Sequence, residues 1–282
     1  MTQRLDGIDV SRYQGTVDWV QVKASCAVPS KSLAAWKVTQ GTRTLDPAAG
    51  TNRKNTATAG IYYRFGYHWL SASTNALSQA KWFLQNFAPL QPGEGVILDC
   101  EEAGITVPQI TTWCAHVEAV TGRPVAIYTG VHVAGGAIWN SQLIFGSGQR
   151  MRWLAAYVSE AKARKACEPY GFDVWQWSSS GSVPGVAGRC DVNMIDHPTL
   201  CDLATGQTPP KPPVPPTEIE DLDMPVCTNA EVFGGFAPLI VKWVVMSNGS
   251  LRHIGEPEWH ARGSEVGTRL SNADIKALGG SL

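Results

Sequence analysis

The chain has 282 residues, a formal net charge of −1 and a hydrophobic content of 44%. A chain of this length can form a full-size globular domain and a second, smaller one. The near-neutral charge argues against a nucleic-acid-binding protein that depends on a basic surface. No stretch approaches the length of a transmembrane helix, so we expect no membrane insertion.

The cysteines and the N-terminus exclude further classes of protein. The seven cysteines are scattered, and none lies in C-x-x-C spacing. We therefore expect neither a disulfide framework nor a structural zinc site, and no other cofactor. The first residues lack the apolar segment of a signal peptide. The sequence thus predicts synthesis in the cytoplasm, of a host cell if the protein is viral.

The first part of the chain alternates between predicted strands and helices. Strands are expected over residues 7–11, 33–39 and 59–69, and a short helix over residues 17–23. Residues 42–54 are polar and predict a loop. A further helix, capped by Ser73 or Thr74, precedes the turn at residues 86–93. Its predicted buried face holds Leu77, Ala80, Leu84 and Phe87.

The next strand carries the strongest chemical signal. Three branched apolar residues at 96–98 predict a buried strand, which runs directly into Asp99, Cys100 and Glu101. Side chains alternate along a strand, so the two acids should point to one face, about 7 Å apart, and Cys100 to the other. Burial and mutual repulsion should keep one acid protonated. A protonated acid beside an ionised one is what cleavage of a glycosidic bond requires.

The remaining elements predict an α/β fold with a TIM-like barrel. A helix from Pro108 to about Val120 is followed by strands over 125–130, 152–157, 172–177 and 191–195. Shorter connections between the late strands indicate irregular wiring there, which we write as (β/α)5(β)3. In such barrels, chemistry takes place at the carboxyl ends of the strands. Those ends also hold Tyr67, His68, Tyr128, Tyr157 and Trp175.

Beyond the barrel, the composition changes. Residues 206–217 are rich in proline and predict a stiff, extended linker between a catalytic domain of residues 1–205 and a small domain of residues 218–282. Within the small α+β domain, Asn248-Gly249 between two apolar runs predicts a hairpin of residues 239–246 and 251–254. A short helix is expected over residues 272–279.

From residue 5 to residue 195, the chain resembles the lysozymes of glycoside hydrolase family 25, the Chalaropsis type that includes phage endolysins. The matching segments occur in the order found in the family. They are Gly7-Ile8-Asp9-Val10-Ser11, Lys37-Val38-Thr39-Gln40-Gly41, Gly66-Tyr67-His68-Trp69, Leu98-Asp99-Cys100-Glu101, Ile127-Tyr128-Thr129-Gly130, Trp153-Leu154-Ala155-Ala156-Tyr157, Trp175-Gln176-Trp177-Ser178-Ser179 and Asp191-Val192-Asn193. Gln40 stands where many members have glutamate.

The resemblance implies a muramidase that cuts the β-1,4 bond between N-acetylmuramic acid and N-acetylglucosamine in bacterial peptidoglycan. It implies that Glu101 donates a proton to the leaving oxygen, while Asp99 assists attack by the substrate's own N-acetyl group. Asp9 and Asp191 would complete the acidic cluster. The residues expected to contact the substrate are Lys37, Tyr67, Tyr128, Tyr157 and Trp175. His68 is expected to be a structural hydrogen-bonding residue.

Other functions fit the sequence less well. An inactive glycan-binding barrel, acting as a wall receptor or assembly module, would not need all the acids of the cluster. A chitinase-like hydrolase would have a longer acidic run before its final glutamate, where this chain has Val96-Ile97-Leu98. A zinc-dependent wall amidase or peptidase would need a His/Asp ligand set that the sequence lacks. The small C-terminal domain would bind the cell wall or a partner, with no ligand indicated.

Overall fold

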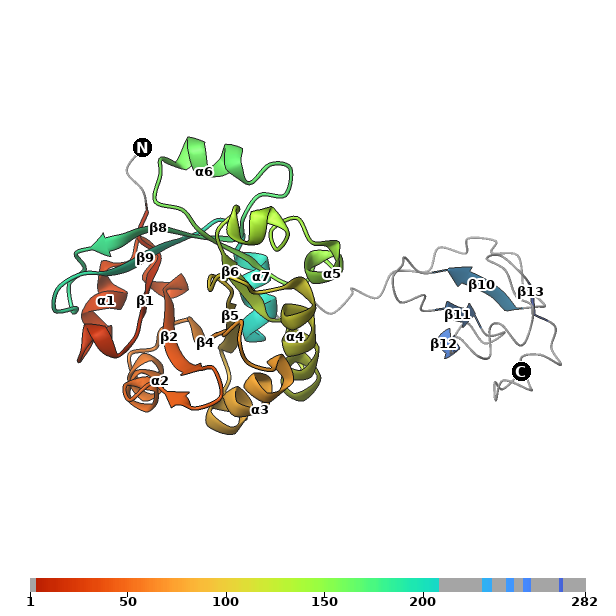
Figure 1. The fold of residues 1–282 in the computed structure, drawn as a ribbon, viewed down its shortest axis with the longest axis horizontal. Helices are drawn as coiled ribbons and strands as arrows, with labels where there is room; N and C mark the ends of the chain where they lie inside the picture. The colour runs from red at the N-terminus through yellow and green to blue at the C-terminus, as the bar shows by residue number, and fades with distance from the viewer. Residues whose placement is uncertain (1–3, 208–229, 235–241, 246–250, 255–268, 271–282) are drawn as a thin grey trace, which may run out of the picture. The chain divides into compact units, whose positions relative to one another are not determined.

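A computed structural model describes residues 4–207 in full and, further on, the backbone of residues 230–234, 242–245, 251–254 and 269–270 (Figure 1). Two compact units contain these elements, residues 1–212 and residues 213–282. Each unit is described by itself. The predicted domain limits and linker, of which residues 208–217 lie outside the described residues, stay predictions.

The first unit is a closed barrel, as predicted. Its eight strands are β1 (Gly7–Val10), β2 (Leu33–Gln40), β4 (Tyr63–Trp69), β5 (Glu94–Asp99), β6 (Ala126–Thr129), β7 (Arg152–Ala155), β8 (Val174–Gly181) and β9 (Cys190–Ile195). They pair in this order, and β1 pairs with both β2 and β9 to close the sheet. The irregularity lies in β9, which runs antiparallel to β8 and β1 while the other neighbours are parallel. A short strand, β3 (Thr44–Leu45), pairs with the end of β2.

Helices surround the barrel in Figure 1. They are α1 (Trp19–Ser25), α2 (Ala49–Thr58), α3 (Ala76–Phe87), α4 (Val107–Thr121), α5 (Gln142–Phe145), α6 (Glu160–Ala166) and α7 (Pro198–Thr205). Helix α7 follows the last strand, and its Cys201 and Ala204 pack against Tyr63 and Phe65 of β4. This contact closes the barrel at the end opposite the carboxyl ends of the parallel strands. No helix among the described residues is both long and apolar enough to cross a membrane.

The predicted loop over residues 42–54 is wrong in part. Residues 42–54 are not only a loop, because they contain β3 and the first half of α2. Helix α2 has no apolar stripe for a periodicity to reveal, since two of its buried residues are polar: Asn52 accepts a hydrogen bond from Trp19, and Thr56 donates to the backbone of Asn52.

The predicted cap and buried face of α3 also need correction. The capping side chain is Asn75, not Ser73 or Thr74, and it accepts from the backbone of Ser78. Leu77 is 37% exposed, and the buried residues of this helix are Ala76, Gln79, Ala80, Phe83 and Phe87. The buried stripe lies about one residue from the predicted one, because it includes the polar Gln79, whose Nε2 donates to the backbone of Ser71 and Thr74.

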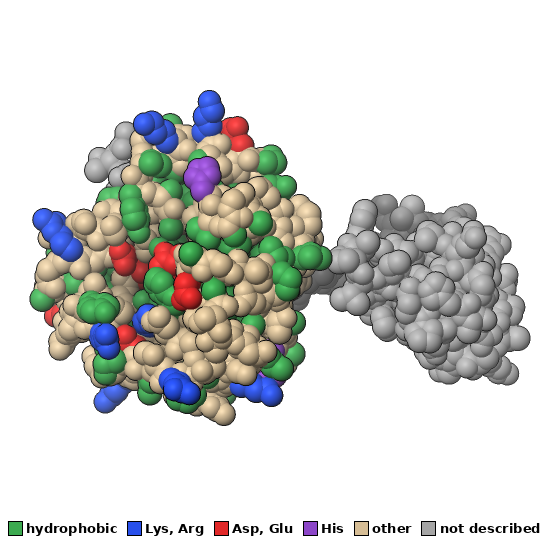
Figure 2. All heavy atoms as spheres, in the orientation of Figure 1, with side chains coloured by type: hydrophobic (Ala, Val, Ile, Leu, Met, Phe, Trp, Pro, Cys, Tyr) green, Lys and Arg blue, Asp and Glu red, His purple; other side chains and the backbone are tan. Residues whose placement is uncertain are grey.

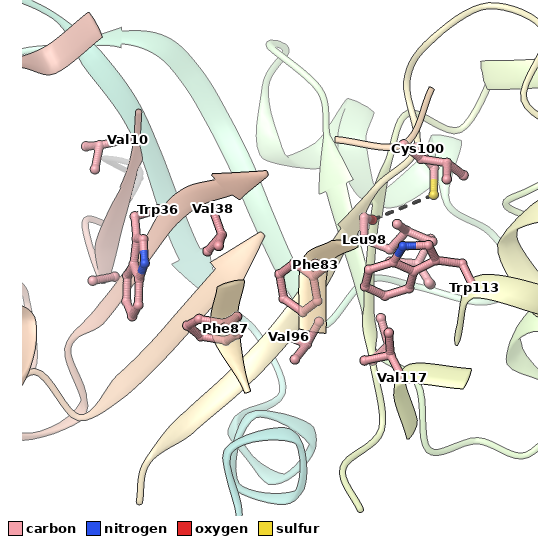
Figure 3. Packing of buried hydrophobic residues seen from close by; sticks show 14 of the residues in the cluster. Val10, Trp36, Val38, Phe83, Phe87, Val96, Leu98, Cys100, Trp113 and Val117 are labelled. Carbon is pink, nitrogen blue, oxygen red and sulfur yellow. Dashed lines mark hydrogen bonds between the residues drawn. The ribbon is translucent and has the colours of Figure 1, made fainter. Parts of the chain in front are cut away.

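Alternation along the strands divides the core into two layers. Outward residues such as Trp36, Val96 and Leu98 pack with Phe83 of α3 and Trp113 of α4 (Figure 3). Inward residues from the same strands, among them Ala35, Phe65, Ile97 and Trp153, fill the barrel below the strand ends. A Cβ on Gly95 would lie 2.5 Å from the ring of Phe65, so only glycine fits there. The interior is therefore solid, and a site can open only at the mouth.

The C-terminal unit contains β10 (Ala230–Gly234), β11 (Lys242–Val245), β12 (Leu251–Ile254) and β13 (Arg269–Leu270), paired in the order β12-β11-β10-β13. The two strands of the predicted hairpin pair antiparallel, with Val245 opposite Leu251. The predicted turn at Asn248-Gly249 and the predicted helix over residues 272–279 lie outside the described residues.

Candidate active site

A pocket of about 160 Å³ opens at the carboxyl ends of the parallel strands. Figure 2 shows acidic side chains gathered in a hollow on the visible face of the barrel. The residues that line the pocket come from all eight strands of the barrel and the loops that follow them, and include every acid of the predicted cluster. They are Asp9, Ala35, Tyr67, Trp69, Ile97, Asp99, Glu101, Tyr128, Trp153, Tyr157, Gln176 and Asp191.

Strand β5 places its two acids as its alternation predicts. Ile97 and Asp99 line the pocket, whereas Leu98 and Cys100 belong to the outer core layer. Glu101 is the second residue after the strand and again lines the pocket. The register aligns Asp99 with Trp69 of β4 and with Tyr128 of β6. The predicted shared face of Asp99 and Glu101 is therefore confirmed.

Asp99 is the most enclosed of the pocket acids. Asp99 is only 5% exposed, and its Oδ1 accepts no hydrogen bond from any described residue. Burial raises the pKa of Asp99 well above its ordinary value; the charge of Glu101 raises it further, and Lys37 opposes the shift. A buried carboxylate oxygen without a donor is costly unless a ligand supplies one. The wall of the pocket thus holds an acceptor that no described residue uses.

Glu101 and Asp191 lie nearer the mouth. Glu101 is exposed, yet its partial removal from water raises the pKa, and the charge of Asp9 adds to this while Lys37 opposes it. Burial, with the nearby Asp9, raises the pKa of Asp191 to about 8. Asp9 and Asp191 are directly opposite in the antiparallel pair of β1 and β9. Asp191 therefore favours a bound proton near neutral pH.

A hydrogen-bond network fixes Asp9 from two sides. Its Oδ2 accepts from Gln176 Nε2 at 2.9 Å and from Asn193 Nδ2 at 2.7 Å. Gln176 Oε1 in turn accepts from the hydroxyls of Tyr128 at 3.0 Å and Tyr157 at 2.6 Å. Burial raises the pKa of Asp9, whereas these donors lower it. The two tyrosine hydroxyls are thus already engaged within the protein, and their rings remain free to face a ligand.

Of the other predicted site residues, Tyr67 and Lys37 lie at the pocket and Trp175 does not. Tyr67 lines the pocket, and Lys37 lies beside it with its Nζ 4.9 Å from the ring centroid of Trp69. Trp175, however, does not line the pocket, so that prediction is wrong. It is fully buried outside the barrel against Phe172, and its Nε1 donates to the backbone of Ala156. The alternation of β8 turns Gln176 inward and Trp175 outward.

His68 has a structural position, as expected. Its ring is buried, with Nδ1 2.7 Å from Thr39 Oγ1 and Nε2 3.1 Å from Gln79 Oε1, and it stacks on Trp113. Burial lowers the pKa of His68 to about 4, so the ring stays neutral in ordinary conditions. His68 thereby connects β4 to α3 rather than taking part in the pocket.

Sequence reasoning missed four polar or aromatic residues of the site. Gln176, Asn193, Trp69 and Trp153 were seen only as parts of motifs. A usable signal exists for two of them: Gln176 is polar between two tryptophans, and Asn193 has the same parity as Asp191 on its strand. Trp153 donates to Asn193 Oδ1 at 2.9 Å, a contact between β7 and β9 that no local pattern indicates.

The acid cluster should lower stability as the pH rises. The folded-state pKa of Asp191 lies above its ordinary value, so the folded protein binds a proton more tightly than the unfolded chain. The contribution of Asp191 to stability is then greatest near pH 4 and falls toward pH 8. Asp191→Asn should raise the unfolding free energy by on the order of 2 kcal/mol at pH 8 and change it little at pH 4. Urea unfolding of the full chain at both pH values measures this.

Asp18→Asn is the matched control for this experiment. Asp18 caps α1, and its hydrogen bonds to Gln21 lower its pKa, so its charge should stabilise the fold at pH 8. The control should therefore gain no stability at pH 8. An Asp191→Asn variant with the same gain at both pH values would contradict the linkage to proton binding.

Comparisons with known proteins agree on one family. A family model described as glycosyl hydrolases family 25 matches residues 8–186. Lysozyme M1 of Streptomyces globisporus is 31% identical over 219 residues, which cover 69% of this chain and 69% of that protein. YegX of Escherichia coli K12, described as uncharacterized, is 29% identical over 198 residues, covering 68% and 70%. The crystal structure of a bacterial lysozyme from Streptomyces coelicolor has a TM-score of 0.61 and 28% identity, covering 73% of this chain and 99% of the other.

Proposed function

Because the chain belongs to glycoside hydrolase family 25 and is a lysozyme-type hydrolase, we propose that it hydrolyses the β-1,4 bond between N-acetylmuramic acid and N-acetylglucosamine in bacterial peptidoglycan. One observation carries the assignment of roles: Asp99 Oδ1 is a buried acceptor without a donor, and Glu101 shares its pocket. A sugar that carries an acetamido group can supply the missing N–H donor.

In the proposed first step, Glu101 acts as the general acid. Its carboxyl proton passes to the glycosidic oxygen as the bond between that oxygen and the anomeric carbon breaks. The acetamido carbonyl oxygen of the same sugar forms a new bond to the anomeric carbon. Asp99 accepts a hydrogen bond from the acetamido N–H and balances the positive charge that develops on this group. The raised pKa of Glu101 supports this role, because it keeps the acid protonated closer to neutral pH.

In the proposed second step, the Glu101 carboxylate takes a proton from water as the water oxygen attacks the anomeric carbon. The bond to the acetamido oxygen breaks, and the sugar is released with its configuration retained. The enzyme needs no nucleophile of its own in this route, so the separation of its two carboxyl groups does not report the stereochemistry. Asp9, held by Gln176 and Asn193, would bind water or a sugar hydroxyl beside the reacting carbon.

Mass spectrometry of fragments released from purified peptidoglycan tests this function. We expect fragments with N-acetylmuramic acid at the new reducing end. Fragments that end in N-acetylglucosamine would assign cleavage to the other glycosidic bond, and released peptides would assign an amidase. A protein that binds peptidoglycan but releases nothing would be the inactive glycan-binding barrel instead.

The proposal extends to the biological role. A catalytic barrel, a proline-rich linker and a small second domain form a layout common among phage endolysins, and we assign that role here, with residues 218–282 binding the cell wall.

Deletion of residues 217–282 should leave hydrolysis of soluble peptidoglycan fragments within about twofold, because every residue lining the pocket lies before residue 192. Lysis of intact cells should fall at least about tenfold, as expected when one of two linked binding modules is lost. Turbidity assays on cells and fragment assays measure the two effects; equal losses in both would contradict a separate binding domain.

A further inference from the structure

The side-chain ammonium of Lys37 lies beside the acidic pocket, and its hydrogen-bond partner is the neutral amide of Gln40. Its Nζ donates to Gln40 Oε1 at 2.7 Å and lies 4.9 Å from the ring centroid of Trp69, a pocket-lining residue. Among residues 4–207, no carboxylate lies within ion-pair distance of this ammonium. Both Lys37 and Gln40 are half-buried, so solvent screens the charge only in part.

A bulge in β2 creates this contact. Residues 37 and 40 have opposite parity, and in a regular strand their side chains would point to opposite faces. The pairing of β2 with β4 shifts register between Lys37 and Thr39, so that Lys37 pairs with Tyr67 and Thr39 with His68. The shift brings Gln40 to the same side as Lys37. Bulges commonly redirect a side chain next to an active site.

From this geometry we propose that Gln40 is a positioning residue: it holds the Lys37 ammonium beside the pocket acids without neutralising it, and so sets the pH range in which the acids are correctly protonated. The inference rests on the proposed roles of Asp99 and Glu101. An amide oxygen accepts the lysine hydrogen bond but carries no net charge, so it does not neutralise the field of Lys37 at the acids. A carboxylate at position 40 would form an ion pair and cancel that field.

The charged groups around Lys37 single out the pocket acids as its targets. Asp99 faces it from β5, Asp46 from the loop after β3, and Tyr13 and Arg12 from the turn after β1. Asp46 is already bound by the backbone N–H groups of Arg12 and Ala48. Arg12 and Tyr13 are exposed to solvent, which weakens their effect.

The direction of the effect follows from the sign of the charge. Lys37 lowers the pKa of Asp99 and of Glu101, against the burial that raises both. It also faces His68, whose pKa it lowers, but that ring is neutral in any case. Cancelling the charge of Lys37 should therefore raise the pKa of both acids. The two limbs of the pH profile, which follow the ionisation of these two acids, should then move upward together.

The test compares pH profiles of peptidoglycan hydrolysis for four full-length variants. Gln40→Glu should move both limbs upward by about one pH unit, and Lys37→Met should move them in the same direction. Gln40→Met, which removes the hydrogen bond but leaves the lysine charge, should produce a clearly smaller shift. Gln149→Glu adds the same charge in the exposed loop before β7, at the opposite end of the barrel, and should leave the profile unchanged. Unmoved limbs in Gln40→Glu would overturn the claim that a neutral partner preserves the effect of Lys37, and unmoved limbs in Gln40→Met would overturn the positioning role of Gln40.

A second readout separates this proposal from the proposed function. NMR titration of the Asp99 side-chain carboxyl carbon reports its pKa in the protein without substrate. Gln40→Glu should raise that pKa, whether or not the chain cleaves peptidoglycan, and an unchanged value would refute the role of Gln40. If the unaltered protein releases no fragments from peptidoglycan, the proposed function fails while the titration still decides the electrostatic claim.

Discussion

Replacing Glu101 by glutamine is expected to lower kcat on peptidoglycan by about 10²–10⁴-fold, the range that one general acid contributes. Glutamine has nearly the same shape but holds no proton that it can give to a leaving alkoxide. Glu101 is exposed at the mouth and makes no side-chain hydrogen bond to a described residue that would be lost, so the fold should persist. Release of reducing ends measures the rate, and thermal unfolding checks the fold.

Its neighbour provides the control. Glu102 accepts from the hydroxyl of Ser71 at 3.1 Å, from the backbone of Ala72 at 3.0 Å and from Trp69 Nε1 at 3.4 Å, and it does not line the pocket. Glu102→Gln should weaken this loop contact and reduce stability by about 1 kcal/mol, with the rate within about tenfold of the unaltered protein. If Glu102→Gln abolished the reaction and Glu101→Gln did not, the assignment of the acid would be reversed.

Asp99→Asn should have the second-largest effect, a loss of about 10²–10³-fold in kcat. Asparagine keeps the side-chain volume, but it replaces a charged acceptor by a neutral amide and so cannot balance the charge that develops on the acetamido group. Binding should suffer less, because the rings of Tyr67 and Trp69 that line the pocket remain. Steady-state kinetics on soluble fragments should therefore show a fall in kcat with a smaller change in KM.

The stability of this variant gives an independent check. Burial raises the pKa of Asp99 well above its usual range, so removing the carboxyl group should stabilise the fold at neutral pH. Asp202→Asn is the control, because Asp202 on α7 accepts from Tyr63 at the closed end of the barrel. That variant should keep its rate and gain no stability. An Asp99→Asn enzyme with an unchanged kcat would remove Asp99 from the reaction.

The elements that could be predicted from the sequence are those with a strong local pattern. The apolar runs that form β2, β5 and β6 are buried on both faces, and they stand out without any tertiary information. Helix α2 could not be found this way, because two of its three buried residues are polar, and one of these, Asn52, accepts a hydrogen bond from Trp19, which is distant in sequence. Polar residues that are buried with hydrogen bonds leave no periodic pattern of hydrophobic residues in the sequence.

Within the candidate site, local patterns again predicted some features, whereas others depend on residues that are distant in sequence. Strand alternation and the position at a strand end are local properties, and they were enough to place Asp99 and Glu101 on one face of β5. The prediction for Trp175 is wrong because it rests on the position near a strand end alone, whereas strand alternation turns this side chain outward. The state of Asp9 depends on Gln176, 167 residues away, and on Asn193, 184 residues away.

By itself, then, the amino-acid sequence determined the order of strands, the barrel class and the acids that end the strands, because all three follow from periods of two and 3.6 residues along the chain. Only the tertiary structure decided which amides hold Asp9, that Asp99 keeps a free oxygen, and that a bulge in β2 joins Gln40 to Lys37. These features arise when barrel closure brings distant strand ends together. Hydrogen bonding and burial then act across distances in sequence that no local pattern records.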